Sequence, residues 1–130
     1  MEHPLMFDPD DPFLHRLREI ALALPGAAEK VSHGRPAFFT TKVFAYYGGS
    51  IKAAGAHEQH DRSLVVHPDP AEVLALAEEE RCYRPAYLGP SGWIGVDLDG
   101  DTDWAEVREL VEASYRETAA ARLVAELDAR

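Results

Sequence analysis

The stretch GWIGVDLDGDTDWAEVRELVEASYR, residues 92–116, predicts a β-strand that leads through an acidic turn into a long amphipathic helix. In an extended strand Ile94, Val96 and Leu98 share one side, and the residues between them point to the other. Helical spacing gives the following segment one face, formed by Trp104, Val107, Leu110, Val111, Ser114 and Tyr115. Beyond Thr118 a run of alanines fits either one long helix or two.

Carboxylates occupy every second position from Asp97 to Asp103, which raises the possibility of a calcium loop. Neither register, starting at Asp97 or at Asp99, supplies the glycine at position 6 and the glutamate at position 12 that such a loop needs. We therefore interpret this segment as a turn followed by a helix cap. Asp103 is the expected N-cap, and Glu106 is expected to return a bond to it as in a capping box.

Upstream, the pattern predicts one helix, a series of short strands and a second helix. Asp11 and Pro12 are typical of a helix start, and the stripe Phe13, Leu17, Ile20 and Leu24 continues to a stop at Pro25.

The segments AEKVSH, AFFTT, KVFAYYGG and SLVVHP favour strands of an antiparallel meander, with polar residues 56–62 as a loop. Asp69 is the expected cap of the second helix, whose inner side is assigned to Val73, Leu74 and Ala77.

Composition indicates a single domain that spans residues 1–130. The net charge of −10 argues against a general nucleic-acid coat protein. Cys82 is the one cysteine, and the opening MEHPLMFDPDDP has no apolar run, so we expect no signal peptide, no membrane segment and a cytoplasmic location. Residues 28–68 are an exception to the acidity, because they hold five lysines and arginines against three carboxylates.

Three segments together resemble the MmcQ/YjbR family: the stretch quoted above, LPGAAEKVSHGRPAFFTTKVFAYY and YRPAYLGPSGW, which cover about residues 24–116 in order. The resemblance implies an α+β fold in which an antiparallel sheet carries helices on one face, similar to frataxin. It also implies weak DNA binding through wing-like hairpins.

Basic residues on or beside the predicted hairpins are the candidate DNA contacts, with Arg35 and Lys42 expected on the solvent face. A two-stranded ribbon with such residues is able to reach phosphates. The set comprises Lys30, His33, Arg35, Lys42 and Lys52.

The alternative is a module that binds a small molecule or a protein. Its pocket is expected to form from the HGRP and RPAYLGPSGW segments, with His33, Arg35, Tyr87 and Trp93 as lining residues.

The sequence shows no complete catalytic set, so we predict no catalytic residue, cofactor or metal. Cys82 is expected to be a buried inert thiol and Ser114 a packing serine. His57 and His60 are expected to be solvated loop histidines rather than zinc ligands.

Overall fold

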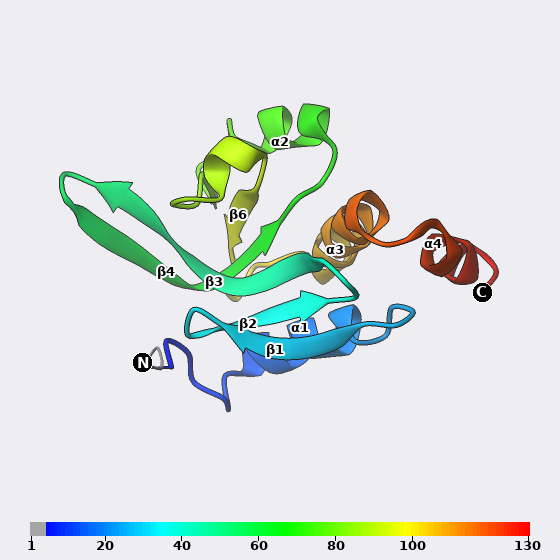
Figure 1. Ribbon diagram of the computed structural model, residues 1–130. Coiled ribbons are helices and arrows are strands. Elements are labelled where there is room, and N and C mark those ends of the chain that lie inside the picture. Colours follow the sequence, from blue (N-terminus) through cyan, green and yellow to red (C-terminus); the bar gives the residue numbers. More distant parts are fainter. Residues whose placement is uncertain (1–4) are drawn as a thin grey trace.

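The computed structural model describes residues 5–130. The prediction of no signal peptide concerns residues 1–12, of which the first four lie outside the described range. Its centre is an antiparallel sheet in the order β1-β2-β3-β4-β6-β5 (Figure 1). The strands are β1 (Ala28–Ser32), β2 (Arg35–Phe39), β3 (Val43–Ala53), β4 (Ala56–Val66), β5 (Cys82–Tyr83) and β6 (Ile94–Asp97). The helices are α1 (Pro12–Ala21), α2 (Pro70–Leu76), α3 (Trp104–Thr118) and α4 (Ala121–Asp128), with a short 3-10 turn η1 (Gly89–Ser91).

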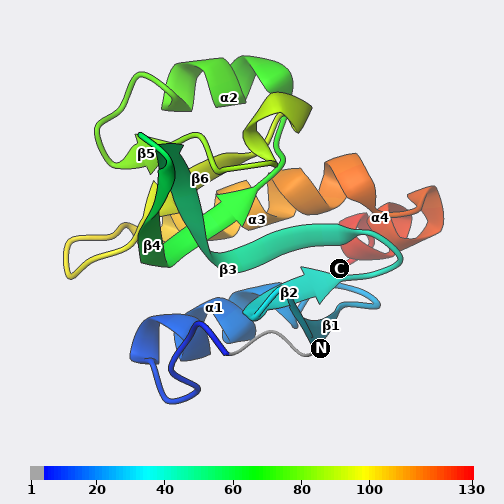
Figure 2. The ribbon, with the colours of Figure 1, turned by 60° about the vertical axis from the view of Figure 1, so that its left-hand side comes forward.

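Helices α1 and α3 lie side by side against one face of the sheet, and α2 lies at its β6–β5 end (Figure 2). The apolar stripes of these helices meet the inward side chains of the strands in one core, which includes Leu14, Leu17, Phe38, Leu64, Val66, Ile94, Val96, Leu110 and Val111. The predicted α+β fold, with an antiparallel sheet and helices on one face, is confirmed. The alternation of Ile94, Val96 and Leu98 is also confirmed, because all three are buried in this core.

The predicted helix caps are present. The carboxylate of Asp11 accepts from Phe13 N at 3.0 Å, and that of Asp103 accepts from Ala105 N at 3.0 Å. Asp69 caps α2 in the same way. The reciprocal half of the capping box is wrong, because Glu106 Oε1 accepts from Arg81 Nη2 instead.

Two further observations concern the inner face of α2 and the C-terminal segment, for which one helix or two was left open. Helix α2 ends at Leu76. Leu76 is buried whereas Leu74 is 66% exposed, so the assignment of Leu74 to the inner side of the helix is wrong. The C-terminal segment forms two helices, separated by extended backbone at residues 119–120. The hydroxyl of Thr118 bonds back to Ser114 O at 3.0 Å, which satisfies a carbonyl at the end of α3.

The prediction of a loop at residues 56–62 is wrong, because this segment is the first half of strand β4. We name residues 49–60 the arm; it is the outer part of the β3–β4 hairpin and projects beyond the rest of the sheet (Figure 1). Its tip is a two-residue turn at Ala54 and Gly55, both with positive φ, as a type I′ turn requires. Most arm residues are exposed, so their polar pattern gives no sign of a strand.

The arm is set off from the inner hairpin by a break in register. Tyr47 pairs with Leu64, but the next pair is Gly49 with His60, so residues 61–63 of β4 lie opposite Gly48 alone. Extra residues of this kind bend a strand and increase its twist.

Among residues 5–130 no helix is long and apolar enough to cross a membrane.

Candidate ligand-binding pocket

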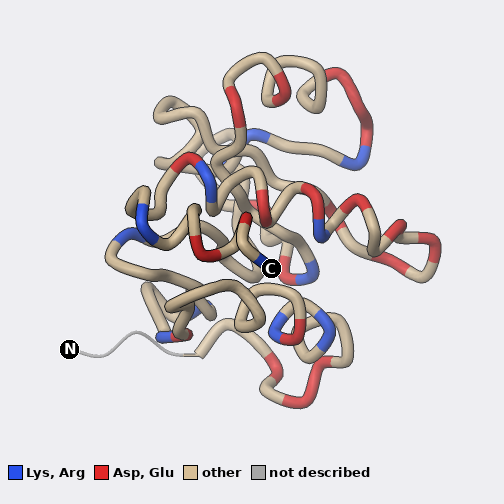
Figure 3. The backbone as a smooth tube through the Cα atoms, turned by 90° about the vertical axis from the view of Figure 1, so that its right-hand side faces the viewer, with Lys and Arg blue, Asp and Glu red and all other residues tan. Residues whose placement is uncertain are grey.

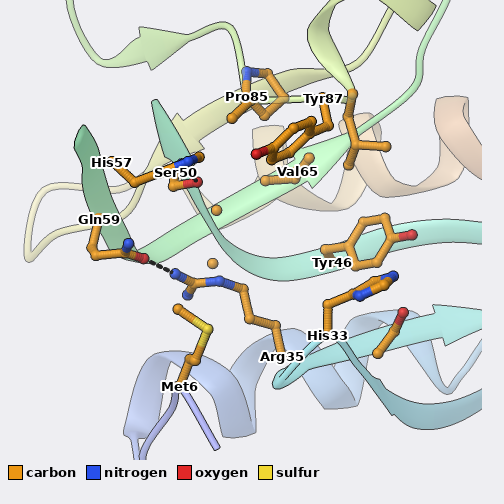
Figure 4. Close-up of a pocket in the computed structure, with 15 residues that line it drawn as sticks. Met6, His33, Arg35, Tyr46, Ser50, His57, Gln59, Val65, Pro85 and Tyr87 are labelled. Atoms are coloured by element: carbon orange, nitrogen blue, oxygen red, sulfur yellow. Dashed lines mark hydrogen bonds between the residues drawn. The ribbon is translucent and has the colours of Figure 1, made fainter. Parts of the chain in front are cut away.

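The face of the sheet opposite α1 and α3 carries a pocket of about 650 Å³ between the arm, the β1–β2 turn and residues 85–88 (Figure 4). Tyr46 and Val65, which pair across β3 and β4, form its apolar base together with Leu88. The full lining is Met6, Ser32, His33, Arg35, Tyr46, Gly48, Gly49, Ser50, His57, Gln59, Val65, Pro85, Ala86, Tyr87 and Leu88.

Arg35 is the buried charge of this pocket, with its residue 8% exposed. Its Nη1 donates to Asp61 Oδ1 at 3.1 Å and its Nη2 donates to Gln59 Oε1 at 2.5 Å. A β-carbon at Gly48 would lie 2.2 Å from Nη1, so the guanidinium occupies space that a larger residue at 48 would fill. The expectation that Arg35 lies on the solvent face is therefore wrong.

The rim of the pocket is formed by an exposed aromatic pair. The ring of Tyr87 stacks on that of His57 with centroids 5.8 Å apart, and Tyr87 is 77% exposed. Tyr87 has a φ of 67°, a left-handed conformation that costs a non-glycine residue about 1–3 kcal/mol. Next to it, Ala86 N donates to Ser50 O at 2.7 Å, which joins the 85–88 segment to the arm.

Behind the pocket, a polar cluster holds the base of the arm to β6. Tyr83 lies on the bare backbone of Gly95, and its hydroxyl is 2.6 Å from Ser63 Oγ. Burial raises the pKa of Tyr83 to about 12, so it stays protonated at neutral pH. The ring of His60 stacks on Tyr83, and its Nδ1 is 2.7 Å from Asp97 Oδ1.

His60 is thus a strand residue whose ring packs on Tyr83 and bonds to Asp97. Its assignment as a solvated loop histidine is wrong. Its Nε2 lies 3.3 Å from Glu58 Oε1, but without the geometry of a hydrogen bond. His57 is exposed, as expected, although it belongs to the arm. Among residues 5–130 no group of three histidine, cysteine or acidic side chains is placed to hold a metal.

Of the four residues predicted for a pocket, the structure brings together His33, Arg35 and Tyr87. Trp93 lines a second, shallower hollow of about 520 Å³, where its ring contacts Tyr46 and His67. Tyr46 is shared between the two hollows.

Sequence reasoning missed the arm residues Ser50, His57 and Gln59 as pocket residues. His57 and Gln59 were missed because residues 56–62 were predicted to be a loop, so no arm was expected. The available signal in the sequence was the Ala54-Gly55 pair, because a two-residue hairpin turn needs residues that accept positive φ and glycine does so readily.

The basic residues assigned to DNA do not form one patch. Lys42 precedes β3 and Lys52 is near its far end, which puts roughly 30 Å of strand between them. That distance is several Debye lengths at physiological salt, about 8 Å each. Lys30 lies over the ring of Phe39, 4.7 Å from its centroid. Figure 3 shows lysines and arginines dispersed along the chain, with acidic residues between them.

The candidate nucleophile Ser114 has a structural role, and Cys82 is half-buried rather than buried as expected. Ser114 is fully buried; its hydroxyl donates to Phe44 O at 2.6 Å and accepts from His67 N at 2.8 Å, as expected of a packing serine. Burial raises the pKa of the Cys82 thiol to about 11, so the reactive thiolate is scarce at neutral pH.

A single antiparallel sheet with helices on one face and a pocket on the other defines an α+β domain. The YjbR family model matches residues 22–117, and the chain belongs to this family.

Two solved structures share the fold. Protein DR2400 of Deinococcus radiodurans, described with the domain DUF419, has a TM-score of 0.59 and 17% identity, covering 88% of this chain and 87% of its own. A Pseudomonas syringae protein, target PsR293 of the Northeast Structural Genomics Consortium, has a TM-score of 0.60 and 15% identity, covering 86% of this chain and 100% of its own. A search of curated proteins gives no match. The likeness to frataxin stays a prediction.

Proposed function

We propose that this protein is a binding module for a small, largely apolar molecule, which the pocket on the open face of the sheet holds. The observation that carries the proposal is a preformed cavity of about 650 Å³ with a buried guanidinium among apolar side chains. Ligand sites have this size and this mixture of apolar walls with few polar groups. The exposed, strained Tyr87 at the rim supports the same site, since backbone strain gathers at ligand clamps.

The test uses N-phenyl-1-naphthylamine, a neutral dye whose fluorescence rises in apolar surroundings. We expect saturable binding to the native protein and loss of that binding in Ser50→Trp, which fills the pocket. Ser91→Trp is the matched control, because Ser91 lines the second hollow and not the pocket.

Loss of dye binding in the Ser91 variant alone moves the site to the second hollow, and no saturable binding to the native chain overturns the proposal. Near-UV circular dichroism of each variant excludes dye uptake by a loosened core.

A second proposal is weak DNA binding, which rests on the exposure of Lys30, Lys42, Lys52 and His33. Three lysines on phosphates predict a salt slope near −3 and a Kd on the order of 10⁻⁴–10⁻⁶ M. Fluorescence anisotropy with a labelled duplex at low salt tests it. Charge reversal of Lys42 and Lys52 should abolish binding, and binding that survives the reversal excludes these contacts.

The pocket is the first proposal because it is one continuous site, whereas Lys30 lies on β1 and Lys42 and Lys52 lie near opposite ends of β3. We also propose a cytoplasmic location, which the single cysteine, unable to form an intrachain disulfide, supports. A protein partner at the pocket rim is the remaining form of the binding proposal, with the exposed Tyr87 as its contact.

A further inference from the structure

The pocket is free of acidic side chains in a strongly acidic chain. The protein has a net charge of −10, yet none of the pocket-lining residues within 5–130 is aspartate or glutamate. The lining side chains that carry or can take up a positive charge are Arg35, His33 and His57. Charge around a cavity selects its ligand, so this lining disfavours cations and favours anions.

The charge of Arg35 is incompletely balanced by the protein. Within residues 5–130 its one carboxylate partner is Asp61, which makes a single contact at 3.1 Å and has a side chain that is 62% exposed. The second contact is with the neutral amide of Gln59. By comparison, Arg18 makes a two-pronged bond to Glu29, at 2.8 and 2.9 Å.

A buried guanidinium needs strong hydrogen-bonded compensation. The bonds to Asp61 and Gln59 use two of the five N–H donors of the guanidinium. A guanidinium suits a carboxylate because its planar donors match both oxygens.

We propose that the pocket binds a small organic anion, with a carboxylate at Arg35 and a flat apolar body between Tyr46, Val65 and Leu88. The hydroxyl of Ser50, on the arm, lies 3.4 Å from His57 Nδ1 and is a further polar group of the lining. This inference rests on the proposed function, and it specifies the charge of the ligand that the pocket accepts.

The same geometry gives Asp61 the role of a competitor. Its carboxylate occupies one donor of Arg35, and an incoming anion meets its charge. Removal of this charge should therefore tighten anion binding while leaving a neutral ligand unaffected.

Three probes with one ring system test the charge preference: 1-naphthaleneacetate, 1-naphthaleneacetamide and 1-naphthylmethylamine, which are anionic, neutral and cationic. NMR titration of the ¹⁵N-labelled full chain to about 5 mM probe detects a Kd near 1 mM. We expect the acetate to bind at least about tenfold tighter than the amide, as a charge-assisted bond provides, and the amine to bind weakest.

Equal affinity for all three probes, or a preference for the amine, overturns the inference and leaves the pocket proposal standing. If none of the three shifts the resonances of pocket residues, both proposals fail.

Asp61→Asn should tighten acetate binding roughly fivefold, the size of a partly exposed ion pair, without changing the amide. Glu58→Gln is the matched control, because it removes the same charge from a nearby exposed residue, on the arm, that does not line the pocket. Equal effects of the two variants would reduce the result to net charge and overturn the role of Asp61. Arg35→Met should abolish the acetate preference, and Asp61→Asn keeps the inference testable if that variant does not fold.

Discussion

Replacement of Ser114 by alanine is expected to lower the free energy of unfolding by about 2–4 kcal/mol. The fully buried hydroxyl serves two backbone groups, Phe44 O at 2.6 Å and His67 N at 2.8 Å, so it ties α3 to two segments of the sheet. Alanine leaves both groups without this partner in a dry site, and a buried group left unpaired costs about 1–3 kcal/mol. The total for two such groups is expected to be smaller than the sum of the two costs, because the neighbouring backbone relaxes.

Urea denaturation followed by circular dichroism measures the loss, and for a chain of this length the melting temperature should fall by about 3–5 °C per kcal/mol. Ser91→Ala, the same change at an exposed position, should stay within about 0.5 kcal/mol of the native protein. In hydrogen-exchange NMR the His67 amide should lose protection in the Ser114 variant. A midpoint that matches the Ser91 control, with His67 still protected, would refute the reasoning.

Three further predictions concern the helix caps Asp103 and Asp11 and the glycine at position 95 of β6. Asp103→Ala should cost about 1 kcal/mol in urea denaturation, because it removes the cap of α3, and an unchanged midpoint would show that this cap contributes nothing. Burial alone raises the pKa of the Asp11 carboxyl, but hydrogen bonds, that from Tyr47 first, outweigh burial and hold the pKa below its usual value. The contribution of ionised Asp11 to the free energy of unfolding is therefore complete above pH of about 4 and is lost as the pH falls through the lowered folded-state pKa. Asp11→Asn should make the free energy of unfolding less dependent on pH in this range, and a variant as acid-sensitive as the native protein contradicts this. Gly95→Ala places a β-carbon 2.2 Å from the ring of Tyr83 and should cost about 1–3 kcal/mol or more, and a double-mutant cycle with Tyr83→Ala that shows no coupling would exclude the clash as the cause.

The parts of the fold that local chemistry determines were predictable from the sequence. Asp11 and Asp103 are caps because a short acidic side chain reaches the amides two residues on, and this needs no knowledge of the rest of the chain. The alternation of Ile94 and Val96 identified β6 for the same reason, since one face of the strand is buried.

The parts that depend on distant segments were not predictable. Arginine is almost always exposed, and the burial of Arg35 becomes intelligible only when Gly48 and the arm are seen beside it. The arm was missed because most of its residues are exposed on both sides of the strands. Its sequence therefore lacks the alternation of apolar and polar residues that identifies a half-buried strand. Trp93 and Tyr87 are six residues apart but face different hollows, because the 3-10 turn at 89–91 redirects the chain between them.

The register break in β4 makes the length of the arm independent of the core. Inside the break, the pairing of Tyr47 with Leu64 fixes which side chains enter the core. Outside it, the arm sets its own register from the turn at Ala54 and Gly55. Residues added in pairs at this tip extend the hairpin without moving any core side chain to the opposite face. The tip is thus the natural insertion point for an affinity tag or a fluorescent label.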